Sequence, residues 1–480
     1  MGLGDRPVVV VGAGIGGLVA ATLLAARGLD VLVIEQAARP GGKIREVTIG
    51  GARIGAGPAR LTLRPVFEAI FAEAGATLSD HLGLVPDHSL GRHLWSDGGC
   101  LDLPAEAAAA EAAIGAFAGA AAARGYREFR ARAKRIHDAL EGPFLMAQRP
   151  GALGLATQTG LRGLLGTSPF ASLWDALGEH FPDPRLRQVF GRVATYVGSS
   201  PLQAPATLML VAHVEQQGLW RIEGGMIRLP EALEALARRH GARLRCQAKV
   251  RRILVSGGRA SGVMLEDGET IAASAVLLNA DPAALAEGHF GREAAGAAER
   301  LPPQRRSFSA ITWAMRSEPG SIPAAHCVLH ADDAVGEYAE LGYRARLPAR
   351  PTATVWAEGE GVLAMVSAPA RTDSRPLPAE TVAACGERVF AALRGVGVAM
   401  PDGERVVTTP ADFDRMFPGA GGALYGPAAQ GWQSAFARPG ARTKLPGLYL
   451  AGGAVHPGAG VAMAAISGRL AAARIIEDRA

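Results

Sequence analysis

A glycine-rich segment near the amino terminus offers the clearest chemistry in this sequence. Gly12, Gly14 and Gly17 form a GxGxxG pattern directly after four consecutive valines. Glycines at this spacing permit a tight turn, a close approach of the backbone to a pyrophosphate, and close packing of a helix on a strand. Glu35 follows Gly17 by 18 residues, near the spacing at which an acidic side chain accepts the ribose hydroxyls. Together these residues predict a dinucleotide-binding site.

A strand, a turn and a helix must hold these glycines in place. Residues 8–26 carry no charged side chain, so their length alone would also suit a membrane span or a signal segment. The interior glycines would weaken one continuous helix by about 1 kcal/mol each, which argues against that alternative. We therefore expect a strand over the valines, a helix over residues 18–26, and a second strand over residues 31–34 that ends at Glu35.

A second pair of glycines, Gly41 and Gly42, follows the acidic residue and precedes Lys43. A further glycine turn with a cation at this place suits a flavin dinucleotide better than a nicotinamide one, because its phosphates and ribityl chain extend further across the sheet. The carboxyl-terminal segment repeats the same order of elements. There we expect a strand over residues 448–451, a glycine turn, and an Ala-rich helix over residues 461–477. Between the two ends, alternating apolar and polar residues in 241–276 predict a strand followed by a hairpin.

In these motifs the chain resembles the FAD-containing amine oxidase superfamily. The resemblance is strongest to the phytoene desaturase-like carotenoid desaturases, and within them to the 1-hydroxycarotenoid 3,4-desaturases, also called methoxyneurosporene dehydrogenases. It covers nearly the whole chain. The more specific blocks that carry it are Gly55-Ala56-Gly57-Pro58, residues 183–198, Glu223-Gly224-Gly225-Met226, residues 421–426 and His456-Pro457-Gly458.

The resemblance implies an α/β fold with a discontinuous, Rossmann-like FAD-binding domain. That domain would comprise residues 1–90, 215–300 and 435–480. An inserted α+β substrate domain, with a helical region facing the membrane, would comprise residues 91–214 and 301–434. The residues implied to hold FAD are Gly12, Gly14, Gly17, Glu35, Gly42, Lys43, Gly57, Pro58, Val250, Gly452, Gly453, Gly460 and Val461.

Two positions depart from the family pattern. Lys43 stands where relatives more often have arginine, so it supplies a charge without a bidentate fork. Gly453 stands where relatives commonly have an aspartate whose carboxylate bonds the ribityl chain. We therefore expect one of two consequences: either FAD binds more weakly, or another group takes the place of that aspartate.

The implied reaction removes hydrogen from a saturated carbon pair of a 1-hydroxycarotenoid, at the 3,4 position. The C–H bonds beside a polyene are too weakly acidic for a side-chain base, so the flavin must perform the hard step. We expect hydride transfer to flavin N5 followed by proton loss, with oxygen or a quinone as the final electron acceptor. His456 and Tyr425 are candidates for proton acceptors or positioning groups, with a purely structural role as the alternative for each.

The composition agrees with a globular protein that handles an apolar molecule. Hydrophobic residues make up 49% of the chain and charged residues 20%, and a carotenoid would need a tunnel lined with aliphatic side chains. The net charge of +5 comes from scattered residues, so we expect no nucleic acid partner. The four cysteines form no CxxC pair, so we expect neither a metal site nor disulfides, and a cytoplasmic location.

Several surface features remain open to more than one interpretation. Residues 161–174 are a candidate for lipid contact, which fits a peripheral association with the inner membrane. The Ala-rich stretch 105–123 predicts a surface helix of the inserted domain. Arg185, Arg187 and Arg192 suit either the family block or a solvated helix face.

Five other functions stay open. A phytoene desaturase or another flavin amine oxidase would use the same cofactor, although an aromatic content of 5% disfavours the aromatic cage of an amine site. A carotenoid isomerase or a retinol saturase-like enzyme would share the fold with a different redox outcome. A lipid-binding chaperone of the GDP-dissociation-inhibitor type would need no flavin. The intact glycine motif, Glu35 and the matching carboxyl-terminal half favour an enzyme.

Overall fold

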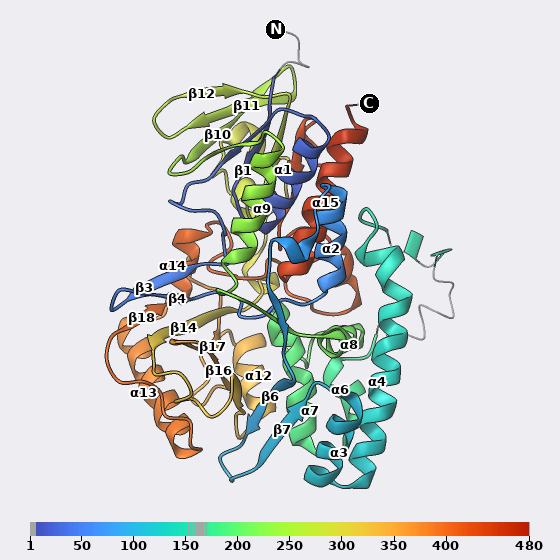
Figure 1. Cartoon of the computed structure of the whole chain (residues 1–480), viewed down its shortest axis with the longest axis vertical. Coiled ribbons are helices and arrows are strands. Elements are labelled where there is room, and N and C mark those ends of the chain that lie inside the picture. Colours follow the sequence, from blue (N-terminus) through green and yellow to red (C-terminus); the bar gives the residue numbers. More distant parts are fainter. Residues whose placement is uncertain (1–5, 152–153, 156, 159–167, 169, 480) are drawn as a thin grey trace.

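The computed structural model describes residues 6–151, 154–155, 157–158, 168 and 170–479. Two sheets and a group of helices form the body of the molecule (Figure 1). The mixed α/β class predicted from the sequence is confirmed.

A parallel five-stranded sheet joins segments from the beginning, the middle and the end of the chain. Its order is β19 (Leu448–Leu450), β13 (Ala275–Leu278), β1 (Val8–Val11), β2 (Val31–Ile34) and β9 (Arg243–Arg245). All five strands come from the three segments predicted to form the FAD-binding domain. The four valines of β1 alternate between two apolar clusters, one on each face, as a strand buried on both sides requires.

Helices cover one face of this sheet and a smaller sheet covers the other. The helical face is formed by α1 (Ile15–Ala26), α2 (Arg64–Glu73), α9 (Arg228–Arg239) and α15 (Val461–Glu477). The opposite face packs on the antiparallel strands β10 (Val250–Ser256), β11 (Arg259–Leu265) and β12 (Thr270–Ala272). Helix α1 begins at Ile15, three residues earlier than the apolar pattern predicted. Figure 1 shows α1 beside α15, so the two ends of the chain form one layer.

A seven-stranded sheet forms the second body. Its order is β18 (Arg405–Thr408), β14 (Ser309–Arg316), β17 (Gly361–Ala368), β16 (Ala353–Glu358), β15 (His326–Leu329), β6 (Ser89–Leu94) and β7 (Cys100–Pro104). One of its faces packs on α13 (Ala379–Gly395) through a continuous apolar cluster. The hairpin of β3 (Glu46–Ile49) and β4 (Ala52–Gly55) packs on the other face, through Ala314 and Leu363.

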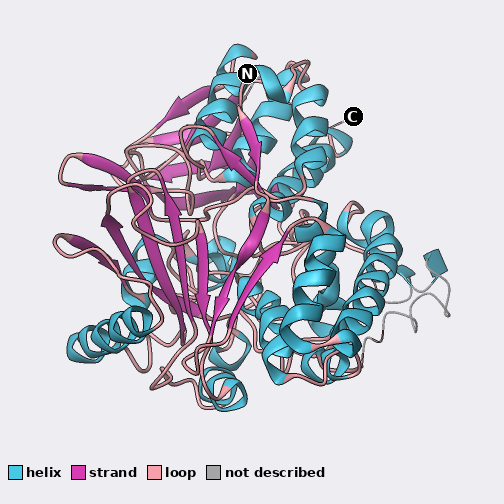
Figure 2. Ribbon diagram, turned by 60° about the horizontal axis from the view of Figure 1, so that its bottom comes forward, coloured by secondary structure: helices cyan, strands magenta, loops and turns pink. Residues whose placement is uncertain are grey.

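A group of helices stands beside this sheet (Figure 2) and shares its own apolar cluster. It contains α3 (Ala107–Ala118), α4 (Ala120–Leu140), α6 (Leu173–Gly178), α7 (Pro184–Gly191) and α8 (Met209–Gln217). The remaining short elements are β5 (Leu84–Pro86), β8 (Trp220–Ile222), α10 (Pro282–Ala286), α11 (Arg292–Ala295), α12 (Ala334–Gly342) and α14 (Pro410–Met416).

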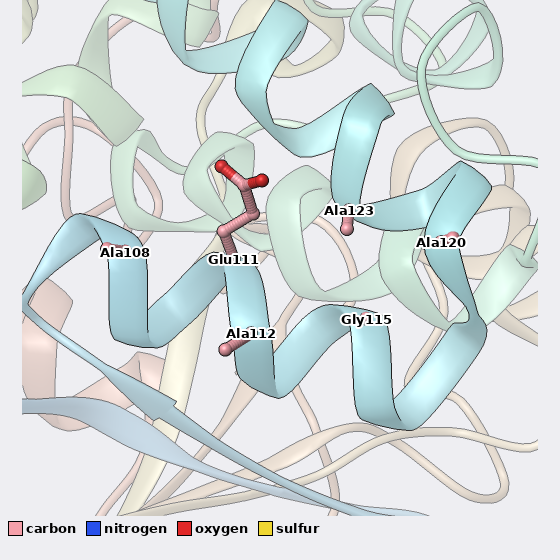
Figure 3. Close-up of a pocket in the computed structure, with 6 residues that line it drawn as sticks. All are labelled: Ala108, Glu111, Ala112, Gly115, Ala120 and Ala123. Atoms are coloured by element: carbon pink, nitrogen blue, oxygen red, sulfur yellow. The ribbon is translucent and has the colours of Figure 1, made fainter.

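The Ala-rich stretch forms two helices, so the prediction of one surface helix was wrong. The chain breaks at Gly119, whose φ of +86° favours glycine and ends α3. The two helices enclose a hollow lined by Ala108, Glu111, Ala112, Gly115, Ala120 and Ala123 (Figure 3). Its one charged side chain, Glu111, is paired with Arg127. We assign no chemistry to this hollow.

In the described ranges, none of the helices combines the length and the apolar character that crossing a membrane requires. The prediction of lipid contact over 161–174 falls largely outside the described residues. Of that stretch, the structure describes 168 and 170–174.

Glu337 in α12 gives the fold a predictable dependence on pH. The carboxylate accepts hydrogen bonds from Thr352 N and Thr352 Oγ1, both at 2.6 Å, but burial dominates and raises its pKa to about 7. Since this pKa lies above the ordinary 4.5, the folded state keeps a proton that the unfolded chain releases. Stability is therefore fully present below pH 4.5 and falls by about 3 kcal/mol as the pH rises to 7.

We expect Glu337→Gln to remove this loss, so the variant should gain stability relative to the wild type as the pH rises from 5 to 8 (about 3 kcal/mol in total). Thermal melts of both proteins across that range would measure the difference. Glu340→Gln, which changes a surface partner of Arg344 on the same helix, is the matched control. A constant difference between wild type and Glu337→Gln at all pH values would contradict the prediction.

Candidate functional site

Two glycine turns meet at the carboxyl ends of β1 and β19. Gly12 has a φ of +97°, and a Cβ on it would lie 2.7 Å from Asn279 O. A Cβ on Gly16 would lie 3.0 Å from Gly452 N, while one on Gly468 of α15 would lie 2.2 Å from Gly16 O. The first and last helices therefore cross in direct backbone contact, and Gly14 and Gly460 belong to one module.

The second glycine pair closes on the first turn. Gly41 N donates to Ala13 O at 2.9 Å, and a Cβ on Gly42 would lie 3.1 Å from the Cα of Gly14. Gly57 approaches the same segment, because its Cβ would lie 2.2 Å from Lys43 O. Pro58 follows it and is exposed. Four segments predicted to surround one cofactor are thus brought together by positions that tolerate no side chain.

Glu35 lies at the end of β2 and its carboxylate faces the first glycine turn. It is 7% exposed, and its two oxygens accept hydrogen bonds from Ala13 N at 2.6 Å and Ala37 N at 2.8 Å. Its backbone oxygen accepts a bond from Ala248 N at 2.9 Å. Val250, two residues further, begins β10, is buried and pairs with Leu265. The predicted ribose and adenine positions are therefore neighbours.

We expect Glu35→Gln to weaken dinucleotide binding about tenfold and to destabilise the fold by about 1–3 kcal/mol. The reason is that both oxygens of Glu35 accept backbone N–H groups, and an amide would set its own N–H against one of them. Titration of the stripped protein with FAD and a thermal melt would measure the two effects. Glu46→Gln, at a surface ion pair with Arg53, is the control, and equal effects of the two changes would refute the assignment.

The carboxyl-terminal turn presents a second helix start to the same place. Gly452 has a φ of +117° and its N–H donates to Ser467 Oγ at 2.7 Å. Gly460, with a φ of +114°, precedes Val461, the first residue of α15. At Gly453 the nearest atom to an added Cβ is 4.0 Å away, so the backbone leaves room for the aspartate of the family pattern. Two helix amino termini, α1 and α15, thus lie at these turns, and a helix amino terminus is a site where backbone N–H groups bind anionic oxygens.

These features fit a flavin dinucleotide, and comparison with known proteins decides the assignment. The family described as flavin containing amine oxidoreductase matches residues 15–476. The chain belongs to this family. The predicted FAD cofactor is thereby confirmed, and the protein is an FAD-dependent oxidoreductase.

Named relatives and solved structures resemble the flavoenzyme along its whole length. A hydroxyneurosporene desaturase of Rubrivivax gelatinosus is 45% identical and covers 97% of this chain and 92% of its own. A hydroxyneurosporene desaturase of Cereibacter sphaeroides is 42% identical over 98% of both chains. The structure of a putrescine oxidase bound to putrescine superimposes with a TM-score of 0.63, at 18% identity, over 98% of this chain and 99% of its own. That last likeness supports the fold alone.

His456 is held by the group of helices that stands beside the seven-stranded sheet. Its Nε2–H donates to Phe144 O at 2.9 Å, and its ring lies edge-on to Phe144. Because a carbonyl can only accept, Nε2 carries the proton in this arrangement. Burial lowers the pKa of the imidazole, and Nδ1 is buried without a partner among the described residues. His456 can therefore accept a proton only at Nδ1.

Tyr425 lies in the loop region between α14 and the carboxyl-terminal strand β19. Burial raises the pKa of its phenol to about 12, so the group is neutral near pH 7 and suits positioning better than proton acceptance. Its ring lies against Gly198, where an added Cβ would be 2.5 Å from Tyr425 Cδ2.

Sequence reasoning predicted Lys43 as a site residue but missed its charged neighbours Asp281 and Arg438. Lys43 is partly buried and donates to Leu424 O, and burial lowers the pKa of its ammonium group, with Asp281 opposing the shift. Arg438 donates to Gly453 O at 2.9 Å, Tyr425 O at 2.8 Å and Pro427 O at 2.9 Å. Burial lowers its pKa to about 10, again opposed by Asp281. These contacts link the second glycine pair to the carboxyl-terminal turn.

Asn279 was also missed as a site residue. It follows β13 directly, its Nδ2 donates to Gly12 O at 3.2 Å, and its side chain faces Gly14, Gly16 and Gly452. A polar residue at the carboxyl end of a buried parallel strand was the available signal. Arg438 gave no such signal, because its hydrogen-bond partners are all backbone carbonyl groups, which no residue type marks.

One cluster of possible metal ligands occurs within the part of the chain that is described. His137, Asp138 and His213 come from α4 and α8, outside the glycine turns. Asp138 is half exposed and paired with Lys134 at 2.6 Å. We assign no metal to it.

Proposed function

We propose that this flavoenzyme dehydrogenates a 1-hydroxycarotenoid at the 3,4 position. The observation that carries the proposal is the 45% and 42% identity, over at least 97% of this chain, to relatives named hydroxyneurosporene desaturase.

FAD, when bound, supplies the acceptor for the hydride that leaves the substrate. The glycine turns at Gly12–Gly17 and Gly452–Gly460 would hold the dinucleotide and the flavin ring, with Glu35 on the ribose and Val250 beside the adenine. Gly57 and Pro58 would shape the backbone next to the ring. Lys43 would supply positive charge through the charged group that it forms with Asp281 and Arg438.

The neighbouring proton needs an acceptor, for which His456 is the better of the two candidates. Its Nδ1 carries a free lone pair in a buried position, whereas the neutral phenol of Tyr425 can only donate or orient. The surrounding apolar packing would exclude water from the reacting carbons.

A peripheral membrane contact would supply the carotenoid. Phe170 and Trp432 support this part of the proposal, because they are 71% and 38% exposed and their rings contact each other at 5.8 Å between centroids. The contact would lie at the cytoplasmic side of the inner membrane, and a quinone or oxygen would take the electrons.

Expression in a host that accumulates hydroxyneurosporene tests the function. We expect a pigment with one more conjugated double bond, identified by chromatography, absorption spectrum and mass. A host that expresses a variant unable to bind FAD should keep its original pigment. Unchanged hydroxyneurosporene in the presence of FAD-loaded protein, together with oxidation of an amine, would overturn the proposal in favour of an amine oxidase.

A further inference from the structure

The seven-stranded sheet has one apolar face and one face that carries polar groups. Cys327, Val355 and Ala364 point to the apolar side and pack on α13. Their neighbours along the strands point the other way, because side chains alternate across a strand. Pairing in the sheet places His93 beside Val328 and His326 beside Trp356 on this second face. A channel for a purely hydrocarbon molecule would not require histidines there.

His326 has an unused acceptor. Its Nδ1 lies 2.9 Å from Leu90 O and must donate, since a carbonyl can only accept. Burial keeps the imidazole neutral by lowering its pKa well below the ordinary value. Nε2 is therefore a bare lone pair, in a side chain of a residue only 5% exposed. No described residue hydrogen-bonds to it.

Two further buried groups near His326 are also unsatisfied. His93 shares a hydrogen bond with His330, Nδ1 to Nε2 at 3.0 Å, which leaves His93 Nε2 without a partner within the described chain. Arg192, 5% exposed, faces Glu215 through Nη1 at 3.5 Å, while its Nε–H has no partner among those same residues. The geometry places Arg192 beside these histidines: Gln188, one helical turn before it, donates to Ala331 O at 2.7 Å and accepts from Trp95, whose ring stacks on His330 at 4.9 Å.

This cluster lies on the side of the sheet that faces the predicted flavin segment. The hairpin leading to Gly57 packs on the same face, against Leu363, and Leu363 pairs with Trp356. Arg60, three residues after Gly57, places its guanidinium 5.1 Å from the Trp356 ring, and that ring stacks on His326 at 3.6 Å. Two side chains, Arg60 and Trp356, thus connect His326 to the loop beside the flavin.

We propose that His326 Nε2 and Arg192 Nε, with His93 beside them, bind the hydroxyl group of the hydroxylated carotenoid end. This inference rests on the proposed function and names the group that the site selects. A hydroxyl needs an acceptor for its hydrogen and a donor for its oxygen. His326 Nε2 supplies the acceptor, and Arg192 Nε–H supplies the donor. The hydroxyl lies within about 4 Å of C3 of the substrate, so it must bind close to the flavin.

Binding and turnover with two carotenoids test the assignment. The probes are hydroxyneurosporene and neurosporene, which lacks the hydroxyl group, each in phosphatidylcholine vesicles with the FAD-loaded full chain. Quenching of tryptophan fluorescence gives Kd, and pigment analysis gives kcat/KM. We expect the wild type to prefer the hydroxylated carotenoid by about 100-fold, since a site built to bond a hydroxyl leaves its own groups unpaired with the other molecule.

His326→Leu should raise Kd for hydroxyneurosporene at least tenfold and leave that for neurosporene unchanged or lower. His326→Gln, whose amide oxygen can accept the hydroxyl hydrogen, should restore part of the preference. If the leucine variant does not fold, Arg192→Met provides a second test with the same expected loss of preference. His180→Leu is the matched control. His180 also has an unpartnered ring nitrogen among the described residues, but it lies beside Phe129 in the group of helices next to the seven-stranded sheet.

The outcomes separate the two proposals. Preferential binding without desaturation would refute the proposed reaction and retain the hydroxyl site. Desaturation of both carotenoids with equal Kd, or a preference that survives both His326→Leu and Arg192→Met, would overturn the hydroxyl site alone. Absence of binding to either carotenoid would overturn both.

Discussion

Gly17→Ala is expected to yield a protein with less than a tenth of the wild-type FAD content. A Cβ on Gly17 would lie 2.1 Å from Gly12 O and 3.0 Å from Asn279 Nδ2. The clash is with backbone, so the turn that faces the cofactor must open or α1 must move away from β1. Overpacking of this kind costs about 1–3 kcal/mol in stability, and the displaced turn would no longer align its N–H groups with the pyrophosphate.

Flavin absorbance per mole of purified protein, together with a thermal melt, would measure this effect. The matched control is Gly395→Ala at the end of α13, where an added Cβ meets open space. That change should leave FAD content intact and stabilise the helix by up to about 1 kcal/mol. A Gly17→Ala protein with full flavin content would mean that the turn does not contact the cofactor.

Arg438→Met is expected to cause the largest loss of stability, about 3–5 kcal/mol. The guanidinium of Arg438 donates to three carbonyl oxygens of two loops, and the residue is only 8% exposed. Methionine retains the length of the side chain but leaves these carbonyls unpaired. It also leaves partly buried Asp281 with one positive neighbour fewer, so the pKa of that carboxyl should rise further above its ordinary value.

Denaturant unfolding of Arg438→Met, Arg438→Lys and wild type would test this. Lysine keeps the charge but cannot reach three acceptors in a fixed fork, so an intermediate loss is expected. Arg442→Met is the control, since Arg442 is an exposed neighbour paired with Asp478, and such surface pairs contribute about 0–1 kcal/mol. Equal losses for Arg438→Met and Arg442→Met would show that the buried contacts contribute little.

The nucleotide-binding half of the fold could be predicted from the sequence in detail. The strands at Val8–Val11 and Val31–Ile34 and the helix at Val461–Glu477 were placed correctly, because buried parallel strands and apolar helices leave continuous patterns between glycine turns. The Ala-rich stretch was placed less well. Alanine favours a helix throughout, and of the two glycines in the stretch Gly115 stays inside α3 while only Gly119 ends it, so composition did not mark the break.

The arginines of the middle block show the limit of local patterns. A solvated helix face was one alternative for Arg185, Arg187 and Arg192, but Arg192 is 5% exposed and faces Glu215. Arg185 remains partly exposed beside Asp183, as a surface residue would. Adjacent charged residues receive different environments only when distant elements pack against one side of them, and that packing has no local signature.

By itself the sequence determined the cofactor and the glycine turns predicted to hold it, because a dinucleotide is bound mainly by backbone at glycine turns whose spacing is local. The partners of Arg438, the position of Asn279 between two turns, and the histidines on one face of the seven-stranded sheet were decided only by the tertiary structure. The positions of the histidines and of Asn279 depend on contacts between residues far apart in the chain, such as His93 with His330 and Asn279 with Gly12, and Arg438 joins two separate loops. Such contacts follow from strand order and loop packing, which no single stretch of sequence contains.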